Sequence, residues 1–297
     1  MAAFPERRTS KAAEWSTRLS AFALTLFLVA GLSHRYNLLD TVPFFWVLGI
    51  VGTLTIVALG LSAYGFYRLW NYGERAGQDA LIGLVIGIVA AAPFAISAYR
   101  VVTLPRLHDI STDLTDPPAM PEAAKNRTAE MNALGPIGGT DAARQQEGYP
   151  LVTGRRYAAP SDRVFESIVT LTAERGWRMY RIASPPTEGA EITIEAAAGS
   201  FLLNLPADVA VRLTDEETSS YVDMRSSSRY GLHDFGDNAA RILRFLTDLD
   251  AVVAAQVAPP DAEEPMPGEA TPPAAPPVPS EPPAGDAPTA DTTTPEG

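Results

Sequence analysis

The stretch ALIGLVIGIVAAAPFAISAY, residues 80–99, contains twenty residues and no charged side chain. A helix needs about 20 apolar residues to cross a hydrocarbon core of about 30 Å. A second uncharged run, residues 42–67, has twenty-six residues, and a third, residues 19–33, has fifteen. The shortest run also suits the core of a signal peptide, but no small-residue cleavage pattern follows it. We therefore predict a three-helix transmembrane anchor over residues 15–102, after a short N-terminal segment, residues 1–14.

Basic residues beside these runs predict how the anchor is oriented. Six Lys or Arg side chains lie before the first run or between the second and third, and three lie on the other side. Basic residues collect on the cytoplasmic side of membrane proteins. We therefore predict that the N-terminus lies in the cytoplasm and that the domain after the anchor lies outside the membrane. The six are Arg7, Arg8, Lys11, Arg18, Arg68 and Arg75, and the three are Arg35, Arg100 and Arg106.

The third run has a small residue at every fourth position: Gly83, Gly87, Ala91 and Ala95. Small residues on one face let another helix come close. We expect this face to pack inside the anchor, with homodimerisation as the alternative. None of the three runs has a charged side chain in its middle, whereas transport pathways usually keep an ionisable group at depth. The pattern indicates an anchor rather than a transporter.

Composition excludes several classes of protein. The chain has 297 residues and no cysteine, which excludes disulfide frameworks, thiolate nucleophiles and cysteine-ligated metal sites. Its formal net charge is −12, of which the last forty residues carry −8. A mildly acidic body argues against nucleic-acid binding, which needs a basic surface. Those forty residues, 258–297, contain thirteen prolines and no aromatic side chain, so we expect a disordered, Pro-rich acidic tail.

Residues 149–257 show the periodicities of a globular domain. Strands that alternate apolar and polar residues are typical of antiparallel sheets with one wet face. We predict an α+β domain in which two helices cover an antiparallel sheet of about four strands. The helices are expected at 159–176 and 237–254, and the strands at 177–183 (WRMYRIA), 191–196 (EITIEA), 208–213 (DVAVRL) and 220–226 (SYVDMRS). Residues 120–148 have little periodicity and are predicted to be a linker or long loop.

Two polar motifs remain. The first, RLHDISTDLTDPP at 106–118, belongs to a polar segment, 103–119, directly after the anchor, and the second, MRSSSRYGLHDFGDNAARI at 224–242, leads into the last helix. We expect the first motif to fold back onto the domain. Asp109 and Asp113 would then pair with Arg225, Arg229 or Arg241, and Asp113 with Arg229 is the pair that we expect to be coupled.

The two motifs, placed after membrane spans, resemble the bacterial family catalogued as domain of unknown function 1499. The resemblance covers roughly residues 104–249 and implies no activity. Together with the predicted orientation, it implies a multi-pass protein of the bacterial inner membrane whose C-terminal domain lies in the periplasm. The positions that match the family pattern are His108, Asp109, Ser111, Thr112, Asp113, Pro117, Pro118, Arg225, Ser226, Ser228, Arg229, Gly231, Asp234, Gly236, Asn238 and Arg241.

The chemistry of the motifs leaves two functions open. Arginines, hydroxyl groups and free N–H groups at a helix start suit an anion, although Asp234 or Asp237 could simply cap the helix while Arg229 and Arg241 pair with acids. We predict a non-enzymatic protein that binds an anionic small ligand or a protein partner, without metal or other cofactor. The alternative is an envelope hydrolase that uses His108 with Asp109 and His233 with Asp234, with or without a metal ion. The candidate ligand-binding residues are His108, Asp109, Ser111, Thr112, Asp113, Arg225, Ser226, Ser228, Arg229, Gly231, His233, Asp234, Asn238 and Arg241.

Overall fold

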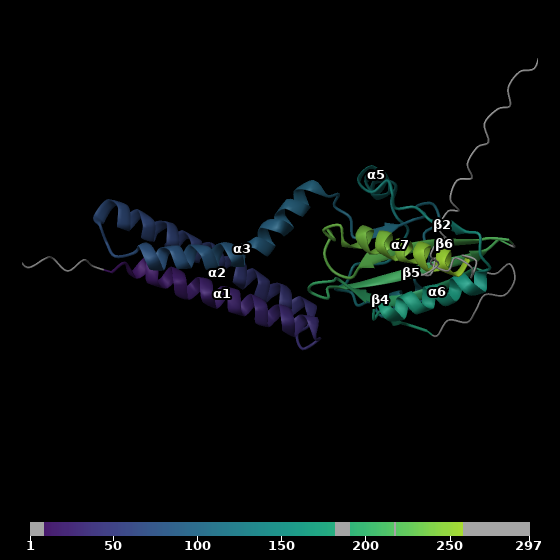
Figure 1. Ribbon diagram of the computed structural model, residues 1–297, viewed down its shortest axis with the longest axis horizontal. Helices are drawn as coiled ribbons and strands as arrows, with labels where there is room; N and C mark the ends of the chain where they lie inside the picture. The colour runs from purple at the N-terminus through teal and green to yellow at the C-terminus, as the bar shows by residue number, and fades with distance from the viewer. Residues whose placement is uncertain (1–8, 182–190, 217, 258–297) are drawn as a thin grey trace, which may run out of the picture. The chain divides into compact units, whose positions relative to one another are not determined.

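Three long helices form the first part of the molecule (Figure 1). The computed structural model describes residues 9–181, 191–216 and 218–257. The helices are α1 (Lys11–Arg35), α2 (Thr41–Tyr72) and α3 (Gly77–Thr103), and each is long and apolar enough to cross a membrane. The three predicted spans are confirmed as helices, and their apolar surfaces indicate insertion in a membrane. The predicted tail, 258–297, and residues 1–8 lie outside the described residues.

Small residues of α3 lie where the helices of the anchor meet. Gly83 and Gly87 are buried, and the hydroxyl of Ser20 on α1 donates a hydrogen bond to the Gly83 carbonyl at 2.8 Å. The buried face continues through Ala90 rather than through Ala91 of the predicted stripe. The prediction that small residues pack inside the anchor is confirmed for the two glycines.

The globular part is built on an antiparallel sheet with the strand order β1-β6-β5-β4-β3, to which β2 adds a second pairing with β6. The long strands are β4 (Glu191–Gly199), β5 (Pro206–Asp215) and β6 (Ser220–Ser228). The short strands are β1 (Asp109–Ser111), β2 (Arg155–Tyr157) and β3 (Arg178–Met179). Only two residues of the predicted strand at 177–183 are in β3, and residues 182 and 183 lie outside the described residues.

Two helices, α6 (Ser161–Glu174) and α7 (Asp237–Val257), lie side by side over one face of the sheet (Figure 1). Gly176 has φ +66°, which ends α6 in a left-handed turn that favours glycine. Apolar side chains from alternate strand positions, among them Val209, Val211 and Met224, form one core with helix side chains such as Ile168 and Leu246. This layer is the core, and the α+β prediction is confirmed.

The opposite face of the sheet is also buried, so the prediction of a wet face is wrong. Asp208, Asp223 and Arg225 on this face are 0%, 2% and 5% exposed. Residues 112–149, which contain α4 (Pro121–Lys125) and α5 (Gly139–Gly148), supply many of their partners. Alternation of apolar and polar residues looks the same in a sequence whether the polar face meets water or a second polar layer.

The segment predicted as a linker or long loop, residues 120–148, therefore holds two short helices that lie on the domain. The carboxylate of Glu195 on β4 accepts hydrogen bonds from the backbone N–H groups of Glu122 and Ala123 at 3.2 and 2.9 Å. The amide of Gln145 on α5 bonds both backbone groups of Ser111. Because these contacts are largely polar, the segment lacks the apolar periodicity from which helices are predicted in a sequence.

Candidate functional site

The first motif is a strand of the sheet rather than a free collar below the anchor. Ile110, in β1, is fully buried in the core. The Ser228 N–H donates to the carbonyl of His108 at 2.8 Å, and Asp109 lies opposite Ser227 in the register. The expectation that the motif folds back onto the domain is confirmed.

A bidentate ion pair between the two motifs joins Asp109 and Arg225. Two guanidinium nitrogens donate to the two carboxylate oxygens at 3.0 and 2.8 Å. The same guanidinium also donates to the carbonyls of Pro118 and Gly135. These bonds engage the Arg225 guanidinium on several sides, so an anion could bind it only by displacing a protein group.

Asp208, on β5, is the centre of a second group of charges. Its carboxylate is fully buried and accepts hydrogen bonds from Arg127 at 2.8 Å and from Arg229 at 2.8 Å. The Tyr180 hydroxyl also donates to it. Burial alone would lower the pKa of Arg229, but the hydrogen bond and charge of Asp208 raise it above its usual value. A buried carboxylate with two arginine partners satisfies the rule that interior charges are paired.

Asp113 contacts a different arginine from the three that were predicted. Its carboxylate lies 3.4 Å from the guanidinium of Arg212, which also bonds Asp116 at 2.8 Å and Asp223 at 3.0 Å. The predicted pair of Asp113 with Arg229 is therefore wrong, because Arg229 is bound to Asp208 instead.

We call Asp109, Arg127, Asp208, Arg212, Asp223, Arg225 and Arg229 the buried polar layer. Every guanidinium in it has at least one carboxylate partner. Hydrogen bonds between charged groups are stronger than neutral ones and fix geometry as well. The layer holds residues 112–149 against the sheet, which is a structural role.

The end of the second motif joins β6 to α7. The side chain of Asn238 accepts from Ser226 at 2.8 Å and from Arg241 at 2.6 Å, and it donates to the Ser228 hydroxyl at 3.0 Å. Arg241 also bonds Asp237 at 2.7 Å. Burial lowers the pKa of Arg241, with Asp237 opposing the effect. The predicted structural interpretation of Arg241 is confirmed, since it pairs with an acid nearby.

The loop before α7 is shaped by Asp234. Its carboxylate accepts the N–H groups of Gly236 at 3.0 Å and Asn238 at 2.8 Å, so it caps the helix start. Burial raises the pKa of Asp234, and these two donors oppose the rise. His233 Nδ1 accepts the N–H of Phe235 at 2.9 Å. Gly231 and Gly236 both have φ +81°, a conformation that favours glycine.

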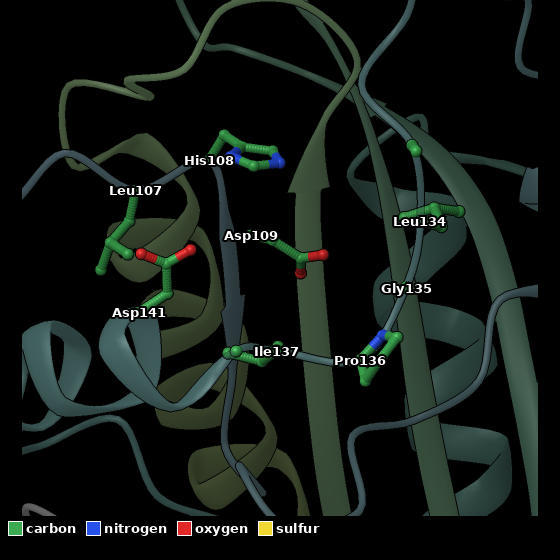
Figure 2. Close-up of a pocket in the computed structure, with 10 residues that line it drawn as sticks. Leu107, His108, Asp109, Leu134, Gly135, Pro136, Ile137 and Asp141 are labelled. Atoms are coloured by element: carbon green, nitrogen blue, oxygen red, sulfur yellow. The ribbon is translucent and has the colours of Figure 1, made fainter.

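One cleft contains residues of the first motif (Figure 2). It has a volume of about 200 Å³ and lies between the start of β1 and the loop at residues 133–138. His108, Asp109 and Asp141 line it, and Figure 2 shows Leu134 and Pro136 on its other side and Ile137 beside Asp141. No hydrogen bond to the imidazole of His108 occurs among the residues that the structure describes. We call this hollow the His108 cleft.

A second hollow lies beside helix α5, which also borders the His108 cleft. It has a volume of about 590 Å³, and Asp113, Gln145, Gln146 and Tyr221 are among its lining residues. Since Asp141 borders the His108 cleft and Gln145 and Gln146 border this one, α5 contributes to both.

Of the candidate ligand-binding residues, the structure places His108 and Asp109 in one hollow and Thr112 and Asp113 in the other. Five other candidates form hydrogen bonds or ion pairs within the domain instead: Arg225, Ser226, Ser228, Arg229 and Arg241. Within residues 9–181, 191–216 and 218–257, no group of three or more His, Asp or Glu side chains is arranged to hold a metal ion.

Sequence reasoning missed several residues at the centre of these networks. Asp208, Arg212 and Asp223 were assigned to a wet face, and Arg127 and Gln145 to a linker. The sequence does carry one signal: acidic and basic residues alternate with apolar ones on adjacent strands, as in DVAVRL and YVDMRS. Without the strand register, however, cross-strand partners cannot be identified.

Residues 109–249 match the model of a family described as "Protein of unknown function (DUF1499)". The match lies within the globular part of the molecule, and the predicted resemblance to this family is confirmed over these residues. Both motifs fall inside the match apart from the first residues of the first motif. A comparison with curated proteins found no match.

Proposed function

We propose that this chain is a non-enzymatic, membrane-anchored protein of the bacterial cell envelope whose outer domain binds a protein partner across α5. The apolar helices α1, α2 and α3 support membrane attachment. The count of basic residues supports an orientation with the domain in the periplasm. The partner would cover the His108 cleft and the neighbouring hollow together.

The observation that carries this proposal is the presence of two hollows beside one helix. The His108 cleft is smaller than the roughly 300–1,000 Å³ of a usual small-molecule pocket. A partner side chain could fill it, while the rest of the partner lay along α5. The two hydrogen bonds between Gln145 and Ser111 would hold α5 in place on β1, which reduces the entropy lost on binding.

The hydrogen-bonding groups of the His108 cleft favour an amide or basic group of the partner. The carboxylates of Asp109 and Asp141 line the cleft but already pair with Arg225 and Arg144, so they offer only their remaining acceptor positions. His108 contributes an imidazole without a hydrogen bond among the described residues. The anionic small ligand is less well supported, because the arginines of the second motif are paired with carboxylates.

The hydrolase alternative has one observation in its favour, the imidazole of His108 beside two carboxylates in a cleft. The other groups already have structural partners. Asp109 is bonded to Arg225, Asp234 caps α7, and His233 accepts a backbone N–H. Metal analysis of the purified full chain separates the two proposals, since one tightly held zinc or manganese that is lost on His108→Ala would favour the hydrolase.

A site-specific crosslink tests the proposed surface. A photoreactive amino acid at Ile137, in the full chain in its native membrane, is expected to give one discrete crosslinked product. Asp141→Lys should abolish this product, because it reverses a charge in the cleft. Asp248→Lys, on α7 and 58% exposed in its side chain, should leave the product unchanged. A product that survives Asp141→Lys would exclude binding at the cleft.

Orientation is tested separately. Alkaline phosphatase fused after residue 257 is expected to be active, because the enzyme folds outside the cytoplasm. A fluorescent protein that folds only in the cytoplasm should stay dark at the same position. The opposite pattern would place the domain in the cytoplasm.

A further inference from the structure

The globular domain is tied closely to the end of the last membrane helix. Helix α3 ends at Thr103. Leu107 is 2% exposed, packs in the core, and its carbonyl accepts the Asp234 N–H at 2.9 Å. Only residues 104–106 separate the two, and four chain steps span at most about 14 Å. Chain connectivity alone therefore keeps the part of the domain near Leu107 close to the membrane surface.

The strand register identifies which other loops share this end of the domain. Asp109 at the start of β1 lies opposite Ser227 near the end of β6. Ser227 in turn lies opposite Asp208 near the start of β5, and Pro206 lies opposite Gly199 at the end of β4. The β4–β5 turn, residues 200–205, and the β6–α7 loop, residues 229–236, thus lie at the membrane end. The β5–β6 turn, which contains Thr218, lies at the opposite end.

These two membrane-end loops carry exposed apolar side chains. Phe201 is 83% exposed, Leu202 is 70% exposed, and Leu232 is 55% exposed. Among the described residues after the anchor, Leu151 is the one other large apolar side chain that is mostly exposed. No charged residue occurs in the β4–β5 turn. Neighbouring exposed apolar side chains on a soluble surface indicate contact with a membrane or another protein.

Hydrogen bonds at the base of the β4–β5 turn fix the position of its tip. The Ser200 N–H donates to the Leu205 carbonyl at 2.9 Å, and the Asn204 N–H donates to the Ser200 carbonyl at 3.0 Å. The Leu205 N–H also donates to the Ser200 hydroxyl at 2.9 Å. Because the base of the turn is closed by three hydrogen bonds, Phe201 and Leu202 are held at its tip and away from the core.

We infer that Phe201 and Leu202, together with Leu232, insert into the lipid interface of the membrane that anchors the chain. Aromatic and aliphatic side chains are favourable at this depth. The short tether makes the contact intramolecular, so its effective concentration is high. The domain would then have a second attachment besides α3, one that fixes its tilt over the bilayer. This inference does not depend on the proposed partner surface or on which side of the membrane the domain lies.

The absence of cysteine makes a direct test possible in the full chain. Leu202→Cys, labelled with an environment-sensitive fluorophore, is compared with Thr218→Cys in vesicles of neutral phosphatidylcholine. Lipids with a spin label near the headgroup should quench the label at residue 202 at least two-fold and leave residue 218 unaffected. Aqueous iodide should quench residue 218 more strongly than residue 202.

The outcomes separate the possible environments of the turn. Equal iodide quenching at both positions, without lipid quenching, would overturn the inference and place the tip in water. Protection from both quenchers would also overturn it, since the tip would then be covered by protein. As a second measurement, Leu202→Ser should raise the hydrogen exchange of the β4–β5 turn in vesicles but not in a soluble fragment of residues 104–257, whose core is self-contained. An equal rise in both would mean that the substitution acts on the fold.

Discussion

Arg225 forms two parallel hydrogen bonds to the carboxylate of Asp109, a residue 116 positions earlier in the chain, at 3.0 and 2.8 Å. Their side chains are 6% and 13% exposed. This pair joins β1, the strand that follows the anchor, to its neighbour β6, and thus connects the membrane attachment to the core.

Removing either partner should destabilise the domain strongly. Asp109→Ala and Arg225→Ala are each expected to lower the free energy of unfolding by about 3 kcal/mol, because each leaves a buried charge unpaired. The double variant should lose less than the sum of the two. Urea unfolding of a fragment of residues 104–257 measures this.

An exposed ion pair provides the control. Asp248 pairs with Arg175, and its side chain is 58% exposed, so Asp248→Ala should cost less than about 1 kcal/mol. If Asp109→Ala behaved like Asp248→Ala, or if the two buried losses simply added, the pair would have no special role.

The parts of the fold that were predictable are those that bury apolar side chains. Val209 and Val211 alternate in β5, and Ile242 and Leu246 recur at helical spacing in α7, so periodicity revealed both. The polar face was not predictable in this way. Asp208 reads as a solvent-facing residue in sequence, and only the strand register places it beside Arg229. The same limit explains why Asp113 was paired with the wrong arginine.

The side chain of Gln145 pairs with the edge of β1 that has no neighbouring strand among the described residues. Its carbonyl accepts the Ser111 N–H at 3.1 Å, and its amino group donates to the Ser111 carbonyl at 2.6 Å. Gln145→Glu keeps the shape but places a carboxylate oxygen against that carbonyl. We expect a loss of about 1–3 kcal/mol. Gln146→Glu, at an exposed neighbouring position, should change stability by less than about 0.5 kcal/mol. Equal effects of the two variants, in the same fragment, would mean that α5 does not cap the strand.

Gly83 allows α1 and α3 to approach each other. A Cβ at this position would lie 2.9 Å from the backbone nitrogen of Thr17, which cannot move aside as a side chain could. Gly83→Leu is therefore expected to lower the melting temperature of the full chain in detergent by several degrees. Gly60→Leu, where a Cβ would meet nothing within 4 Å, is the control. A melting temperature unaffected by Gly83→Leu would show that the two helices do not pack at this face.

Tyr180 should ionise at unusually high pH. Burial, and then its hydrogen bond to Asp208, raises the pKa of its hydroxyl to about 12, although Arg229 opposes the rise. An unfolded tyrosine ionises near pH 10. Between about pH 10 and pH 12 the folded state keeps a proton that the unfolded state has lost, so stability should fall as the pH rises through this interval. The difference in absorbance at about 295 nm between the wild-type fragment and Tyr180→Phe isolates this group. In the urea-unfolded chain this absorbance difference should rise near pH 10. If it also rose near pH 10 in the folded domain, the Tyr180 hydroxyl would not be held by Asp208.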